Sequence, residues 1–207
     1  MHKPTSGSKT VAQVQADFNL PGFKFRIRGN YGRGAKHLYV DDMPGLLDKY
    51  KLEPRRCQFI HIGDNDYAVR VYQGPKRYTE LPPSPPEDVA ERIVQLYERY
   101  GSYCNGPTFI MALLPRHGQP KYCTWAARVN AVLKERCHQL TRLHGSRQRL
   151  YFLSCPSPLY LDAGVLGDKP GYHYEGGEVH TPDGVHLNLK GYAMYYRTIR
   201  KKLAGNV

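Results

Sequence analysis

The chain has 207 residues and carries 30 Lys or Arg against 18 Asp or Glu, which gives a formal net charge of +12 at pH 7. Its length fits one α/β domain or two small ones and allows a full hydrophobic core. No apolar run is long enough to span a membrane, and the polar start of the chain does not resemble a secretory signal. We therefore expect an intracellular protein with no membrane span.

The basic charge favours contact with polyanions, so nucleic acid is one expected partner. The alternative is a basic protein that has no such partner. Lys and Arg side chains gathered on one face would support nucleic-acid binding, whereas an even scatter would weaken it.

Five cysteines are present, and no two of them form a Cys-x-x-Cys pair. The odd number and the spacing indicate a reducing compartment. Cys57, Cys137 and Cys155 lie in or beside apolar segments, and we expect them to be small core residues.

The first half of the chain begins with polar residues 1–10, which we expect to be flexible. Apolar spacing predicts a short helix over 11–18, and the alternation of apolar and basic residues predicts a half-exposed strand over 23–28. That strand leads into a glycine-rich loop over 29–34. A second helix is expected over 41–50.

The rest of the chain alternates between strand and helix patterns, with an irregular region after the first buried strand and a proline-rich connector before the next helix. The expected elements are a strand over 57–62, the connector over 81–86, a helix over 87–100, a strand over 107–114, a helix over 125–143, a strand over 150–153, a long loop over 156–182 and a basic amphipathic helix over 189–203. This alternation predicts a single α/β domain over 11–205, a three-layer α/β/α sandwich with a mainly parallel sheet and helices on both faces.

The strand over 57–62 ends in Gly63, and Asp64, Asn65 and Asp66 follow at its carboxyl edge. Ligands of open α/β sheets bind outside this edge, and an Asn side chain there can donate an N–H to an oxyanion. The alternative is a strand followed by a local turn, because Gly, Asn and Asp are turn formers. His61 is expected to be a buried, satisfied histidine of the strand.

Asp183 and His186 lie three residues apart, between the long loop and the last helix. A carboxylate beside an imidazole fixes the tautomer of a histidine base, which can then activate a hydroxyl nucleophile. The alternative is a helix-start turn capped by Asp183 or Asn188. A zinc site built from His173, His180 and His186 lacks tight ligand spacing, so we expect no metal and no other cofactor.

Three blocks together resemble the SGNH/GDSL hydrolases. Residues 183–192 (Asp-Gly-Val-His-Leu-Asn-Leu-Lys-Gly-Tyr) are similar to the family's last block, Asp-x-x-His before the final helix. Residues 63–66 (Gly-Asp-Asn-Asp) match its Gly-x-Asn-Asp block, and residues 30–34 (Asn-Tyr-Gly-Arg-Gly) are similar to its glycine block. The resemblance covers most of residues 23–205. Within the family, the nearest resemblance is to the SGNH-like domains of chordate, mobile-element-associated proteins.

The resemblance implies a flavodoxin-like fold in which His186 is the base, Asp183 orients it, and Gly32 and Asn65 donate to the oxyanion. The nucleophilic Ser is where the sequence departs from the family, because the Gly-Asp-Ser block and the first buried strand are missing. Ser6 falls nearest the expected place, with Ser8 second. The missing block indicates either a truncated chain or a degenerate member of the family.

Two functions follow from these observations. The first is an esterase-like serine hydrolase that acts on an acyl ester of a small molecule or a polymer. The second is a non-catalytic SGNH-like module that binds nucleic acid or an acidic partner. The sequence leaves the substrate and the oligomeric state open.

Overall fold

The structure of the 207-residue chain is a computed structural model. The chain divides into two compact units. One unit holds the described residues between 34 and 113 and between 125 and 154, and it carries the sheet and residues 63–66. The remaining described residues belong to a second unit. The structure describes residues 34–35, 57–68, 70–74, 77–101, 106–116, 119–144, 150–154, 197–201 and 204.

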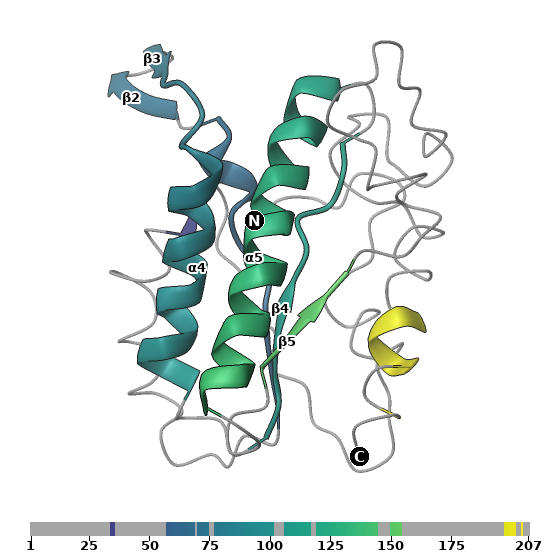
Figure 1. The fold of residues 1–207 in the computed structure, drawn as a ribbon. Coiled ribbons are helices and arrows are strands. Elements are labelled where there is room, and N and C mark those ends of the chain that lie inside the picture. Colours follow the sequence, from purple (N-terminus) through teal and green to yellow (C-terminus); the bar gives the residue numbers. More distant parts are fainter. Residues whose placement is uncertain are drawn as a thin grey trace, which may run out of the picture. The chain divides into compact units, whose positions relative to one another are not determined.

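Among the described residues, three parallel strands form a sheet in the order β1 (Gln58–Ile60), β4 (Thr108–Met111) and β5 (Leu150–Leu153) (Figure 1). The register pairs Phe59 with Phe109 and Phe109 with Tyr151, and the three rings stack with centroids 5.0 and 5.5 Å apart. Parallel strands joined by helices confirm the predicted α/β class with a mainly parallel sheet.

Helix α4 (Pro86–Tyr100) lies between β1 and β4 in the chain, as predicted. Pro86 stands at its start with two acidic residues in the first turn, and Gly101 ends it by donating its N–H to the Tyr97 carbonyl. This placement suits the missing N–H of proline and the dipole of the helix. The apolar face is buried, and its Leu96 and Tyr100 pack against Ile60 and Ile62.

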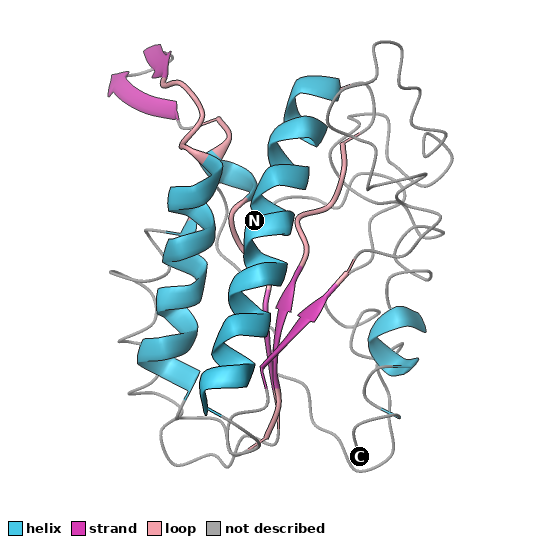
Figure 2. Ribbon diagram, in the orientation of Figure 1, coloured by secondary structure: helices cyan, strands magenta, loops and turns pink. Residues whose placement is uncertain are grey.

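Helix α5 (Pro120–His144) begins five residues before the predicted start at residue 125. The reason lies in its first turn, where the Cys123 N–H donates to the Gln119 carbonyl at 3.0 Å and Pro120 takes the first helical position. Helices α4 and α5 run side by side (Figure 2). They are joined by ion pairs from Arg128 to Glu87 at 2.8 Å and from Arg136 to Glu91 at 3.3 Å.

The region after Asp66 contains a two-stranded antiparallel hairpin, β2 (Arg70–Gly74) and β3 (Arg77–Glu80). The prediction of an irregular region here was wrong. The signal was present in the sequence, because β-branched and aromatic residues flank a Gly-Pro pair.

Several predictions from the sequence lie outside the described residues. These are the helices over 11–18 and 41–50, the strand over 23–28, the long loop over 156–182 and the missing first strand. Residues 197–201 are helical, within the helix predicted over 189–203. The single domain over 11–205 stays a prediction. In the part of the chain that the structure describes, no helix is both long and apolar enough to cross a membrane.

Candidate functional site

A sharp turn follows β1 at its carboxyl end. Gly63 has a φ of 123°, a left-handed conformation that favours glycine, and η2 (Asp64–Asp66) is the 3-10 helix that follows. A Cβ on Gly63 would lie 3.2 Å from Ile93 Cδ1 and from Leu113 Cδ2. The glycine is therefore needed both for the backbone conformation and for the space between the helix and the sheet.

The 3-10 turn presents its three polar residues differently. Asn65 is exposed, Asp64 is half-buried and Asp66 is only 4% exposed. The Asp66 N–H donates to the Gly63 carbonyl at 2.9 Å and closes the turn. Asn65 thus lies at the surface, at the sheet edge where ligands of α/β folds bind.

The Asp66 carboxylate connects this turn to the end of the glycine-rich loop. Its Oδ2 accepts the N–H of Ala35 at 2.7 Å, and its Oδ1 lies 3.7 Å from Nη1 of Arg92 on α4. Gly34 lies so close that a Cβ on it would fall 2.7 to 2.9 Å from the three carboxylate atoms. A buried carboxylate requires such partners, and one of them here comes from Ala35, 31 residues earlier in the chain.

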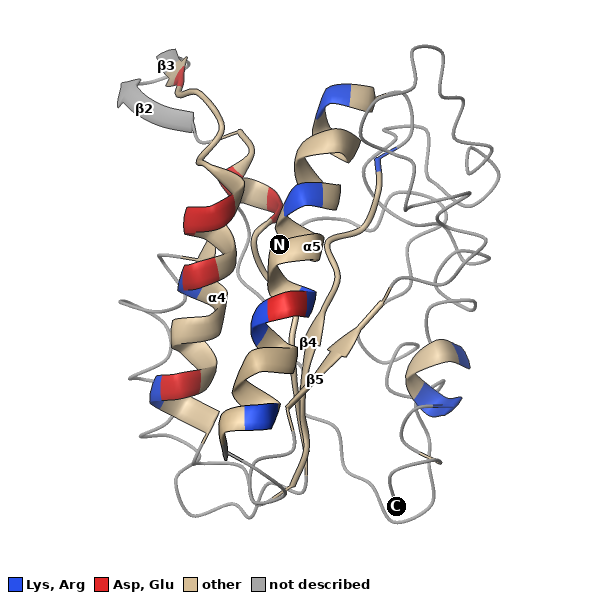
Figure 3. Ribbon diagram, viewed as in Figure 1, with Lys and Arg blue, Asp and Glu red and all other residues tan. Residues whose placement is uncertain are grey.

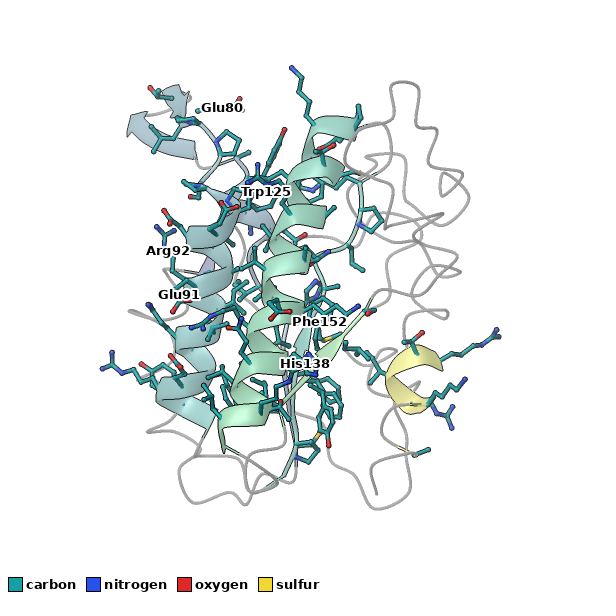
Figure 4. The ribbon with its side chains drawn as sticks, viewed as in Figure 1. Glu80, Glu91, Arg92, Trp125, His138 and Phe152 are labelled. Carbon is teal, nitrogen blue, oxygen red and sulfur yellow. The ribbon has the colours of Figure 1, made fainter. Side chains whose placement is uncertain are left out.

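The proline-rich connector over 81–86 also bonds to the backbone of this turn. The Asp66 carbonyl accepts the N–H of Ser84 at 3.0 Å, and the Ser84 carbonyl accepts the indole N–H of Trp125 at 2.8 Å. The Tyr67 ring lies 5.3 Å from the Trp125 ring at a tilt of 60°. Figure 4 shows Trp125 on α5 and Arg92 on α4, the two helices that hold this turn.

His61 corrects one prediction. It is exposed rather than buried, because β1 ends at Ile60 and His61 already belongs to the loop. Its Nε2 lies 3.7 Å from Asp64 Oδ2, and both side chains are about one-third exposed, at 32%. The buried-histidine interpretation was therefore wrong.

Of the predicted site residues, the structure describes Asn65 and places it on the exposed turn. Ser6, Gly32, Asp183 and His186 lie outside the described residues, so their roles stay predictions. The structure does bring the end of the glycine block to the Asn65 block, through Gly34 and Ala35. The part that Asp66 plays was not predicted from the sequence, because it depends on a contact with Ala35, 31 positions away.

No family model matches the sequence, and no curated protein matches it. Solved structures do match. A carbohydrate esterase family 3 protein from Talaromyces cellulolyticus has a TM-score of 0.55 and 14% identity, with 90% of this chain and 76% of that chain covered. A GDSL-like lipase from Bacteroides thetaiotaomicron has a TM-score of 0.50 and 15% identity, with 87% of this chain and 75% of that chain covered.

These likenesses concern the fold. The chain has an SGNH/GDSL-like fold, an α/β/α sandwich with a mainly parallel sheet. The alternation of strand and helix patterns predicted the sandwich, and the three sequence blocks predicted the likeness to SGNH/GDSL hydrolases. At such low identities, a shared fold does not carry an activity from one protein to another.

Proposed function

We propose that this chain is an SGNH/GDSL-type serine hydrolase that cleaves an acyl ester. The observation that supports this most is the exposed Asn65, held on a 3-10 turn at the carboxyl end of β1. The end of the glycine block is attached to that same turn through Asp66. The fold is that of solved structures named as an esterase and a lipase, which adds to the case.

In this proposal, the hydroxyl of Ser6 attacks the acyl carbonyl carbon, and His186 takes the hydroxyl proton while Asp183 orients the imidazole. The Gly32 N–H and the Asn65 side-chain amide hold the negative charge that develops on the carbonyl oxygen. His186 then gives its proton to the departing alcohol. In the second half of the reaction, water attacks the acyl-serine and loses a proton to His186, and His186 gives that proton to the Ser6 oxygen as the acid leaves.

The substrate is an ester of a small molecule or a polymer. The finer resemblance, to SGNH-like domains of chordate mobile-element-associated proteins, is part of this proposal and is supported by the sequence of the glycine block at residues 30–34.

The direct test is hydrolysis of p-nitrophenyl acetate by the wild type, Asn65→Ala and Asp64→Asn. Losing one oxyanion donor should lower kcat by about 10²- to 10³-fold in Asn65→Ala, with KM within about threefold of the wild type. Asp64→Asn changes the adjacent residue of the same turn and should keep the wild-type kcat. Equal activity of the wild type and Asn65→Ala would contradict the proposal, as would a folded wild type that releases no p-nitrophenol.

A second candidate, a non-catalytic SGNH-like module that binds nucleic acid or an acidic partner, is favoured by one observation: the sequence contains no Gly-Asp-Ser block. The charges on the two described helices α4 and α5 do not add support for nucleic-acid binding. Figure 3 colours mainly acidic residues along α4 and mainly basic residues along α5, so the two helices together do not carry a single sign of charge. Binding of a fluorescent oligonucleotide over a salt series, with affinity falling as salt rises, would support this candidate.

A further inference from the structure

We propose that Asp66 is a positioning residue, whose buried carboxylate holds Gly34 and Ala35, at the end of the glycine-rich loop, against the Asn65 turn and so restrains the spacing of the groups that bind the oxyanion. This inference rests on the proposed function, because it concerns the same site. Asp66 itself touches no reacting atom in this account and acts through the backbone that it holds.

The first step is the hydrogen bond from the Ala35 N–H to Asp66 Oδ2, which is short at 2.7 Å and buried. A bond from a backbone N–H to a carboxylate is charge-assisted and roughly twice as strong as a neutral one. The loop therefore has a strong attachment at this point.

The second step is the fit between Gly34 and the carboxylate. A Cβ at residue 34 would lie 2.7 Å from Asp66 Oδ2 and 2.9 Å from both Cγ and Oδ1. Alanine at this position would push the carboxylate away, so the glycine and the aspartate require each other. This reciprocity is typical of a close approach between backbone and side chain.

The third step is that Asp66 cannot shift without moving the turn. Its N–H and its carbonyl are bonded to Gly63 and Ser84, and its other carboxylate oxygen lies 3.7 Å from Nη1 of Arg92. Asn65 is its immediate neighbour. Moving the Asp66 carboxylate therefore separates the loop from the Asn65 turn.

The consequence for the site follows from chain connectivity. Gly32 is two residues before Gly34, and two residues of extended chain span at most about 7 Å. Fixing Gly34 and Ala35 on Asp66 limits where the Gly32 N–H can lie relative to Asn65. Oxyanion donors act through such preorganisation, so small displacements lower the rate of the chemical step more than they weaken substrate binding.

The experiment compares Asp66→Ala and Asp66→Asn with Asp64→Asn, which removes the same charge two residues away. We expect Asp66→Ala to lower kcat for p-nitrophenyl acetate by about 10- to 100-fold, with KM within about threefold. Asp66→Asn keeps an oxygen that can accept the Ala35 N–H, so it should recover part of the loss. Asp64→Asn should match the wild type. An unchanged kcat in Asp66→Ala, or a KM increase that accounts for the whole loss, would overturn the proposal.

Hydrogen exchange of the Ala35 amide separates this inference from the proposed function. In folded Asp66→Ala the amide should exchange at least about 10-fold faster than in the wild type, and in Asp64→Asn it should not change. If the wild type hydrolyses no ester, the proposed function fails, whereas the exchange rate still decides whether Asp66 holds the loop. Unchanged exchange in Asp66→Ala would overturn that part as well.

A reciprocal variant guards against a general loss of stability. Gly34→Ala should reproduce the kcat loss of Asp66→Ala, because both separate the carboxylate from the loop. Gly101→Ala is the matched control, since its Cβ would meet the Tyr97 ring at 2.8 Å at the far end of α4. It should lower stability without the loss in kcat. Equal kcat losses in the two glycine variants would contradict a specific role for Asp66.

Discussion

The side chain of Asn130 on α5 makes two hydrogen bonds with the backbone of one residue, Leu113, just beyond the end of β4. The Leu113 N–H donates to Asn130 Oδ1 at 2.8 Å, and Asn130 Nδ2 donates to the Leu113 carbonyl at 3.0 Å. Leu113 in turn packs over Gly63, where its Cδ2 limits the space for a Cβ. The amide of Asn130 therefore fixes the backbone beside the Asn65 turn.

Replacing Asn130 by Ala removes both buried hydrogen bonds to the Leu113 backbone, and should lower the free energy of unfolding by about 2–4 kcal/mol. The measurement is the urea midpoint with an unchanged m-value. Gln139→Ala is the control, because within the described part of the chain Gln139 bonds to side chains of its own helix, and its replacement should change stability by less than about 0.5 kcal/mol. Equal midpoints for Asn130→Ala and the wild type would show that the two bonds contribute nothing.

Gly63→Ala should destabilise the protein by about 1–3 kcal/mol, because alanine is strained at a φ of 123° and its methyl group would crowd Ile93 and Leu113. Differential scanning calorimetry measures this as a lower Tm. The variant should also lower kcat for ester hydrolysis, since Gly63 opens the turn that carries Asn65. A Tm equal to that of the wild type would contradict the left-handed turn.

Trp125 is the single tryptophan of the chain, so its fluorescence reports on its own surroundings, which include the proline-rich connector. The residue is 8% exposed, and its indole N–H donates to the Ser84 carbonyl at 2.8 Å. Trp125→Phe keeps an aromatic ring beside Tyr67 but loses this bond, which should cost about 1–2 kcal/mol of stability by urea denaturation. In the wild type, fluorescence emission should shift to longer wavelength on unfolding. Emission typical of exposed indole in the folded protein would contradict the buried position.

The thiol of Cys137 on α5 should make the free energy of unfolding depend on pH. Cys137 is 2% exposed, and burial raises the pKa of its thiol from 9.0 to about 12. Because the folded pKa lies above the unfolded one, the unfolded chain loses the proton first as the pH rises. The contribution to stability is therefore fully present below about pH 9 and is lost between about pH 9 and 12.

Urea midpoints at pH 8 and pH 10 test this contribution in the wild type and in Cys137→Ala. The wild type should lose about 1 kcal/mol more than the variant between the two pH values, since one pKa unit corresponds to about 1.4 kcal/mol. Cys57→Ala, at a half-buried position, should keep the wild-type difference. The same loss in the wild type and in Cys137→Ala would contradict the assignment.

Elements with strong local signals could be predicted from the sequence. The two acidic residues of its first turn and the spacing of apolar residues predicted α4 to within one residue, and the apolar run over 150–153 predicted β5. The burial of Cys137 was predicted correctly, Cys57 is only half-buried, and Cys155 lies outside the described residues. Local periodicity determines which residues face the core, so these predictions needed no knowledge of the tertiary structure.

The features that the sequence could not give depend on contacts between distant segments. Asp66 is buried and bonded to Ala35, a residue 31 positions away in the chain. No local sequence pattern indicates that these two residues are in contact. Asn65 could be proposed as a site residue because a buried strand and a glycine precede it. The exposure of His61 was missed because the apolar pattern continues through Ile62, two residues past the end of β1.

The measurement that tests the central claim most directly is labelling of the folded chain with a fluorophosphonate, mapped by peptide mass spectrometry, beside the His186→Ala variant. A working serine hydrolase is expected to carry the adduct on one serine, Ser6 in this account, and to lose it when His186 is replaced. An adduct on Ser8 would keep the hydrolase and move the nucleophile. A folded wild-type chain that takes no label would contradict the hydrolase and favour the non-catalytic module.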